Sequence, residues 1–243
     1  MRSPEGRRPD APNRWAEPYA HRLMPFDIDL SPVALLATWA AGIAAATAAV
    51  AWWRVVGAGY LWVAVGTALL TGVWSAATVG GAIGFAALVL ALVLARRPQL
   101  AAPALAVGAV AFAVQAMTAV DPLLVVTGAV ALGGTTCEML LGHWYLVDPT
   151  LPRWALRRLD AVGIVGLVAD TLVIVVLGAF TVGGLLPVTF VVLAGLSILM
   201  MVGVWFSLKE RGYEGVMAAT GLSYLTVLTA LGSVALGRIL LAM

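Results

Sequence analysis

The side chains that could do chemistry in this 243-residue chain are few, and they lie within long apolar segments. Glu138, His143, Asp170, Tyr224 and Arg238 all fall in the second half, whereas the apolar segments of the first half contain no charged residue. A charged group in the middle of a membrane span costs about 2.5 to 3.5 kcal/mol on insertion scales, so each such group is a functional candidate. We therefore expect the functional site in the second half of the chain.

Two of these residues, Glu138 and Asp170, are acids. Glu138 lies nine residues before Val147, where its segment ends, and Asp170 lies nine residues after Ala161, where the next segment is expected to begin. Antiparallel helices would hold both carboxyl groups at a similar depth, roughly 14 Å from one membrane surface at about 1.5 Å per residue. Two neighbouring carboxyl groups in a low dielectric cannot both ionise cheaply, so one would keep a proton and could relay it.

The alternative role for the two acids is structural, as hydrogen-bonded links between helices. The hydroxyl groups available as partners are those of Thr135, Thr136, Ser223 and Tyr224. Thr135 and Thr136 could also bond to backbone carbonyl groups or across to another helix. In the same segment Gly133, Gly134 and Gly142 would permit the close approach of a neighbouring helix.

His143 is followed by two aromatic residues, Trp144 and Tyr145, one helical turn from the end of its segment. An imidazole that donates a hydrogen bond between stacking aromatic rings could hold a quinone head at the depth of the lipid headgroups. The alternative is an interfacial anchor whose imidazole faces water. His143 lies five residues after Glu138, about 140° around a helix, so direct coupling of these two side chains is not expected.

The histidine and cysteine residues do not form a set of metal ligands. The other histidine, His21, lies in the N-terminal segment and is expected on the opposite side of the membrane from His143. We therefore do not expect a haem whose two axial ligands are histidines of this chain. Cys137 lacks partners for zinc or copper. We expect no metal site, and a stand-alone enzyme is the least favoured class because neither a nucleophile with its base nor a phosphate loop is present.

The elements that must position these residues are membrane helices. The chain is 62% hydrophobic and 11% charged, with a mean hydropathy of +1.01, whereas a soluble domain has about 25% charged residues. Charge, proline and glycine signals divide it into segments of about 20 residues, the length that crosses a bilayer. Eight spans are predicted, over 32–53, 57–77, 81–95, 101–120, 123–147, 161–180, 186–208 and 216–241. We predict an all-α, multi-pass bundle over residues 31–243, preceded by a polar tail rich in Pro and Arg over 1–30.

Basic residues favour one side of the predicted bundle. The Lys and Arg residues between spans all fall in the connections after spans one, three, five and seven, as Arg54, Arg96, Arg97, Arg153, Arg157, Arg158, Lys209 and Arg211. Basic residues in short loops stay cytoplasmic, so these connections are predicted to be cytoplasmic and both termini outside the cell membrane. Residues 148–159 form the longest internal loop, and its second half is expected to be a short basic helix that rests on anionic headgroups.

A short repeat suggests an internal symmetry. The sequence Thr-Val-Gly-Gly occurs at 78–81 and again at 181–184, each time in the turn after an even-numbered span. A four-plus-four duplication would produce this pattern, and its halves would be related by an axis along the membrane normal. The turn at 78–81 also leaves a second arrangement open, in which spans two and three form one re-entrant hairpin.

These features favour a function inside the bilayer. Nucleic-acid binding is not expected, because no basic stripe with interleaved aromatic residues is present. We predict a non-catalytic proton- or quinone-handling subunit of a membrane energy-converting complex, in which Glu138 and Asp170 exchange protons and His143 holds a quinone. Its partners would be the lipid bilayer and other membrane subunits or a second copy. The alternative is a small-solute or ion transporter that uses the same acids for coupling.

Overall fold

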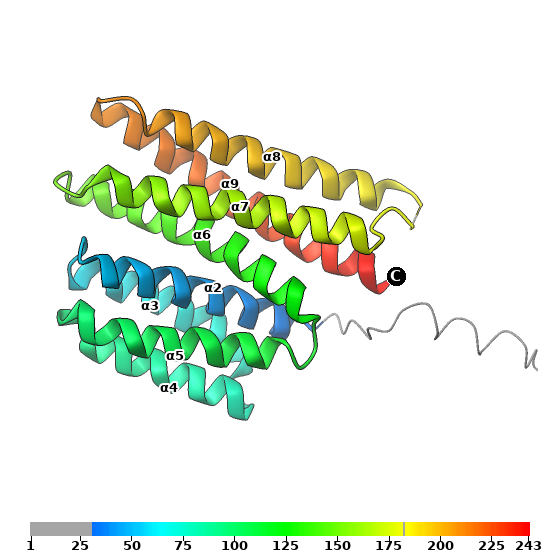
Figure 1. The fold of residues 1–243 in the computed structure, drawn as a ribbon, viewed down its shortest axis with the longest axis horizontal. Coiled ribbons are helices and arrows are strands. Elements are labelled where there is room, and N and C mark those ends of the chain that lie inside the picture. The colour runs from blue at the N-terminus through cyan, green and yellow to red at the C-terminus, as the bar shows by residue number, and fades with distance from the viewer. Residues whose placement is uncertain (1–30, 182) are drawn as a thin grey trace, which may run out of the picture.

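The computed structural model describes residues 31–181 and 183–243, and this part of the chain forms eight long helices and no strand (Figure 1). All eight helices are long and apolar enough to cross a membrane. The predicted all-α membrane bundle is therefore confirmed. The predicted tail over 1–30, which includes His21, lies outside the described residues.

Eight helices follow one another with short connections. They are α2 (Pro32–Trp53), α3 (Ala58–Gly72), α4 (Val79–Val93), α5 (Pro98–Ala116), α6 (Pro122–Val147), α7 (Arg153–Leu177), α8 (Leu185–Ser207) and α9 (Tyr213–Ala242). Short 3-10 turns over Val73–Ser75 and Leu94–Arg96 extend α3 and α4 to 18 residues each, so each is long enough to cross the membrane separately. A proline begins α2, α5 and α6, at the position where a helix does not need the missing N–H.

The start of α7 differs from the sequence prediction. The span was expected to begin at Ala161 after a separate basic helix, but one continuous helix runs from Arg153 to Leu177. Pro152 precedes its first turn, and no proline or glycine interrupts the residues that follow until Gly163. The helix begins eight residues earlier than expected, and different polar residues of α7 therefore face α6.

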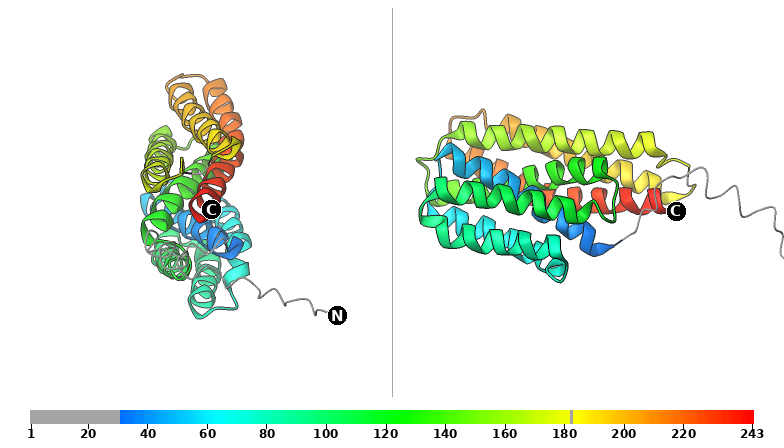
Figure 2. Two further views of the ribbon diagram at one scale, coloured as in Figure 1. Left: turned by 90° about the vertical axis from the view of Figure 1, so that its right-hand side faces the viewer. Right: turned by 60° about the horizontal axis from the view of Figure 1, so that its bottom comes forward.

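The helices form two groups of four, α2–α5 and α6–α9 (Figures 1 and 2). In each group the first helix packs against the second and the fourth, and the third also packs against the second and the fourth. The two groups meet mainly through their first helices, α2 and α6. This common pairing order is the arrangement that a four-plus-four repeat implies. The first Thr-Val-Gly-Gly sequence forms the N-cap and first residues of α4, and the second ends at Gly184, just before α8.

Three glycines make α6 the central helix of the bundle. A Cβ atom at Gly133 would overlap the backbone of Gly42 in α2. A Cβ at Gly134 would lie 2.6 Å from the backbone of α7, and one at Gly142 would lie 2.7 Å from a threonine hydroxyl of α9. The prediction that these glycines permit close helix approach is confirmed, each for a different neighbour.

The start of α2 and the C-terminus lie at the same end of the bundle, which we call the far end (Figure 1). The basic residues of the connections lie at the opposite end, which we call the basic end. An even number of crossings requires the chain to begin and finish on the same side. The assignment of the basic end to the cytoplasm remains a prediction from the charge pattern.

Candidate proton site and buried ion pair

The contact between α6 and α7 fixes which of their residues share a depth. The helices are antiparallel, with Gly134 against Gly163, and this register places Asp170 opposite Thr127. Thr127 lies eleven residues before Glu138, roughly 16 Å along the helix. Glu138 and Asp170 therefore do not share a depth as expected, because the earlier start of α7 shifts Asp170 toward the far end.

Asp170 forms a buried ion pair with Arg238 of α9. Nη1 and Nη2 of Arg238 each donate to one carboxylate oxygen of Asp170 at 2.7 Å. The Thr127 hydroxyl donates to Asp170 Oδ1 at 2.7 Å, and Arg238 Nη2 also donates to the carbonyl of Leu124 at 2.6 Å. Within residues 31–181 and 183–243 this is the only ion pair. It ties α6, α7 and α9 together with both charges compensated.

Arg238 lies about one turn from the end of α9, where a long side chain can extend to the lipid headgroups. It is instead buried, with 7% of its surface exposed, and its charge is directed into the bundle. Long side chains on a helix point back toward its N-terminus, which directs Arg238 away from the far surface and toward Asp170. Asp121 has a separate role, since its carboxylate accepts a hydrogen bond from the Leu123 N–H at 2.8 Å and caps α6.

Glu138 lies at a second polar layer, nearer the basic end. Its side chain is fully buried, and the Ser223 hydroxyl of α9 donates to its Oε2 atom. Its Oε1 atom has no hydrogen-bond partner among the described residues. Asp160 of α7 faces the same level, is also fully buried, and has no partner for either carboxylate oxygen. The register of α6 against α7 sets Asp160 opposite Cys137, the neighbour of Glu138, so Asp160 takes the place expected for Asp170.

Asp160 was missed by the sequence analysis because it was assigned to the loop before the span. A signal for it existed. Asp160, Gly163, Leu167 and Asp170 recur at helical spacings of three and four residues, which places them on one face of a continuous helix. The cluster of arginines just before Asp160 is typical of the end of a membrane segment, and it places the predicted start of the span after Asp160.

The two threonines predicted near the site bond elsewhere. Thr135 donates to the carbonyl of Ala131 at 2.8 Å, one turn back in its own helix. Thr136 accepts a hydrogen bond from the indole N–H of Trp39 in α2 at 2.9 Å. Thr136 therefore links the two groups of helices, and within the described residues neither threonine forms a hydrogen bond with an acid.

His143 and Tyr224 form a polar pair on the membrane-facing surface of α6 and α9. The Tyr224 hydroxyl and His143 Nδ1 lie 3.2 Å apart, and the two rings are nearly perpendicular. Both side chains are exposed at the surface of the bundle. Ser223, the neighbour of Tyr224, binds Glu138, so the surface pair adjoins the buried acid across the contact between α6 and α9.

The two aromatic residues after His143 point in other directions. Trp144 packs against Gly59 of α3, where its ring fills the space that a Cβ would occupy. Tyr145 is buried, and its hydroxyl accepts a hydrogen bond from Arg153 Nε at 3.2 Å. Successive residues leave a helix about 100° apart, so the expected stacking of Trp144 and Tyr145 around His143 does not form.

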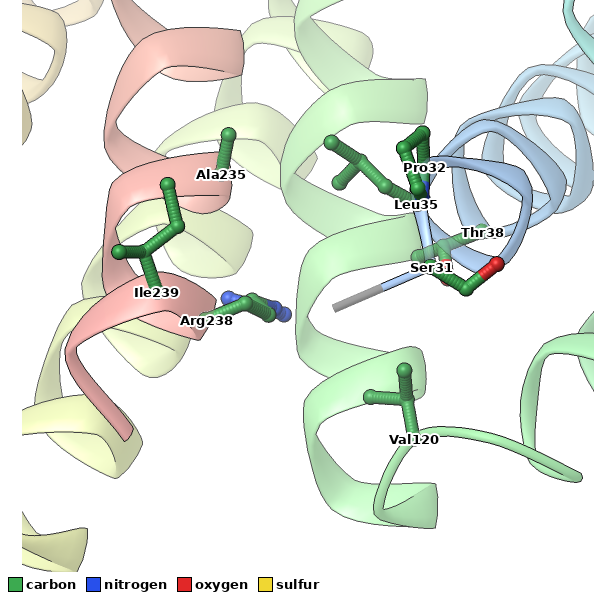
Figure 3. Close-up of a pocket in the computed structure, with 8 residues that line it drawn as sticks. All are labelled: Ser31, Pro32, Leu35, Thr38, Val120, Ala235, Arg238 and Ile239. Carbon is green, nitrogen blue, oxygen red and sulfur yellow. The ribbon is translucent and has the colours of Figure 1, made fainter. Parts of the chain in front are cut away.

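A cavity of about 400 Å³ opens at the far end beside the ion pair (Figure 3). It lies between the start of α2, the connection from α5 to α6, and the end of α9. The lining is apolar apart from Ser31, Thr38 and Arg238. Figure 3 shows the Arg238 side chain extending from α9 into the space between the helices.

Comparison of the chain with protein-family models, curated proteins and solved structures finds no match. Within the described part of the chain, no three His, Cys, Asp or Glu side chains come together as metal ligands. The function must therefore be inferred from where the polar side chains of this chain lie within the bundle.

Proposed function

We propose that this protein handles protons inside the membrane at Glu138 and Asp160, as a non-catalytic component of an energy-converting membrane assembly. The supporting observation is the burial of these two carboxyl groups at one depth with no cation paired to either among the described residues. Two uncompensated charges in a low dielectric are costly, so at least one of the two carboxyl groups is expected to hold a proton. Arg238 already compensates Asp170, which therefore serves as a structural anchor in this proposal.

The proposed exit for a proton lies at the contact between α6 and α9, although the side chains of Ser223 and Tyr224 leave α9 about 100° apart and no hydrogen bond links them within the described residues. Ser223 bonds to Glu138, and the next residue, Tyr224, bonds to His143 at the membrane-facing surface. An imidazole can both donate and accept a proton near neutral pH. The pair would thus exchange protons between the buried acids and a molecule at the surface of the bundle.

A quinone head fits the surface pair as the molecule held there. Its carbonyl oxygens accept hydrogen bonds, and His143 and Tyr224, while bonded to each other, keep one free N–H or O–H donor at a surface that faces lipid. The fit depends on these two side chains alone, because Trp144 packs against α3 and Tyr145 is buried. A quinone, when bound, would supply the redox chemistry that other subunits complete.

An infrared titration of the purified protein in lipid nanodiscs tests the proton site. A protonated carboxyl group absorbs separately from a carboxylate and shifts in D₂O, so the wild type should show a protonated band near neutral pH. Glu138→Gln or Asp160→Asn should remove or move that band. Wild-type spectra with no protonated carboxyl band would contradict the proposal.

Asp148 supplies the matched control for this titration. It lies in the connection between α6 and α7, outside the membrane spans, where the Thr150 hydroxyl donates to it at 2.6 Å. That hydrogen bond holds the pKa of the Asp148 carboxyl below its usual value. Asp148→Asn should therefore leave the protonated band unchanged.

A small-solute or ion transporter is the second candidate function. The far-end cavity favours it, because that cavity extends to the buried Arg238 in a bundle with four-plus-four pairing (Figure 3). Proteoliposome uptake that exceeds the empty-vesicle background and falls in Arg238→Gln would support transport. Background uptake for cations, anions and neutral solutes alike would count against it.

A further inference from the structure

Two shallow grooves run along the membrane-facing side of α2. The first, of about 540 Å³, lies between α2 and α5 and includes Ala48 and Ala102. The second, of about 240 Å³, lies between α2, α6 and α7 and extends as far as Gly42. Ala49 and Trp53 line both grooves, so the two run together at the basic end of α2.

The grooves exist because the outward face of α2 carries short side chains. Ala45, Ala48 and Ala49 are partly or fully exposed between the larger helices on either side. Alanine side chains leave the space between helix axes open at the surface, and the walls of both grooves are apolar apart from Gln99 at the end of the first. In a bilayer such a surface is covered by hydrocarbon chains.

The length of the second groove matches one leaflet of a membrane. From Trp53 to Gly42 it extends eleven residues along α2, roughly 16 Å at about 1.5 Å per residue. The hydrocarbon core of a bilayer is about 30 Å thick, so the groove covers about half of it. Its occupant would then have apolar chains of one leaflet and a head near Trp53.

The guanidinium group of Arg158 lies beside Trp53, where the lipid head would bind. The Arg158 guanidinium lies 4.6 Å from the ring centroid of Trp154 and 5.7 Å from that of Trp53. The two indoles meet edge to face at 5.4 Å and so fix the position of the guanidinium. Arg158 is exposed and forms no ion pair within the described residues, so its charge and planar donors are directed toward the headgroup layer.

Further positive charge lies beside the first groove. Arg96 and Arg97 are exposed and line a hollow of about 460 Å³ that meets this groove at Gln99. Each groove therefore has a basic side chain beside it. Arg96 and Arg97 lie beside the first groove, and Arg158 lies beside the second. This arrangement complements an anionic head that carries two apolar chains.

We propose that an anionic phospholipid of the basic-end leaflet binds along α2, with its phosphate at Arg158 and its two acyl chains in the two grooves. Guanidinium groups bind phosphate through paired hydrogen bonds, and indole rings favour the headgroup boundary. The lipid would cover the seam where α2 meets α6 and α7. It is a site separate from Glu138 and Asp160, and it does not depend on the proton-handling proposal.

Native mass spectrometry tests this site on the full-length protein, purified from vesicles that contain phosphatidylglycerol and phosphatidylcholine in equal amounts. We expect the wild type to retain phosphatidylglycerol preferentially. Arg158→Gln should lower that retention roughly fivefold, the loss of about one basic-residue interaction with an anionic lipid. Equal retention of the two lipids by the wild type would overturn the proposal.

Lys209→Gln is the matched control. Lys209 is also exposed at the basic end, where it lies over the rings of Trp205 and Phe206, but it borders neither groove. The Lys209→Gln protein should retain phosphatidylglycerol as the wild type does. An equal loss in Lys209→Gln and Arg158→Gln would show only a general effect of surface charge and would contradict the site.

Ala49→Trp fills both grooves without changing charge and should also release the lipid. Thermal unfolding of each variant in detergent checks that the fold is kept, and if Ala49→Trp is unfolded, Arg158→Gln decides the outcome.

Discussion

Asp160 and Asp170 are ten residues apart on the same face of α7, but their surroundings differ. Asp170 accepts hydrogen bonds from two guanidinium nitrogens and one hydroxyl. Asp160 accepts none among the described residues. Burial of an acid is therefore compatible with two roles, an anchor where a cation compensates the charge and a proton carrier where none does.

The anchor role predicts how the protein responds to loss of one ion-pair partner. Arg238→Met should lower the free energy of unfolding by about 3–5 kcal/mol, because it leaves the Asp170 charge buried without compensation. Chemical unfolding in detergent, followed by circular dichroism, measures this change. Adding Asp170→Leu to the same chain should recover most of the loss, since two apolar side chains leave no buried charge.

Arg211→Gln is the control for this experiment, because Arg211 is exposed in the connection between α8 and α9. It should unfold as the wild type does. An Arg238→Met protein as stable as the wild type would show that the ion pair does not hold α7 to α9.

The sequence allowed some of these residues to be predicted and not others. Glu138 and the close-packing glycines of α6 were recognised because a charge or a glycine inside an apolar segment is visible without knowing its neighbours. Asp160 and Arg238 were not given their roles, because those roles depend on helix register. Register is determined by side-chain packing between helices, which one sequence does not display.

At the scale of elements, the first turns of α7 bind the connection between α8 and α9 at the basic end. Arg153 donates to the carbonyls of Glu210, Arg211 and Gly212, and Arg157 donates to the carbonyl of Leu208. These bonds explain why α7 can begin with arginines. Their charges are paired with helix-end carbonyls of α8 and its following turn, so they need not form a separate surface helix.

This arrangement predicts that Arg153 orders the connection between α8 and α9. Arg153→Ala removes charge-assisted hydrogen bonds worth about 1.5–3 kcal/mol each, so amides in residues 208–212 should exchange at least roughly tenfold faster. Hydrogen exchange with mass spectrometry measures this rate. Arg211→Ala is the control, because Arg211 accepts from Arg153 through its backbone carbonyl, which the substitution keeps. Equal acceleration of exchange in both variants would refute the role of Arg153.

At the scale of the whole molecule, the two groups of helices differ in content although they share one pairing order. The group α2–α5 buries no charged side chain within the described residues, whereas α6–α9 buries Glu138, Asp160, Asp170 and Arg238. The number of spans was predictable from sequence because bilayer thickness sets the length of each apolar segment. The contact between the groups was not predictable, because it depends on which residues of α6 face Gly42, the one glycine of α2.

That contact gives a prediction for the assembly of the two groups. A Cβ at Gly42 would overlap the carbonyl of Ala129, so Gly42→Leu should push α2 from α6 and lower the free energy of unfolding by about 1–3 kcal/mol or more. Gly66→Leu is the matched control, because a Cβ at Gly66 of α3 meets nothing within 4 Å and faces outward. Unfolding in detergent, followed by circular dichroism, compares the two. Equal stability of both variants would mean that the close approach of α2 to α6 does not hold the groups together, and the bundle would then depend on its loops and on lipid for its assembly.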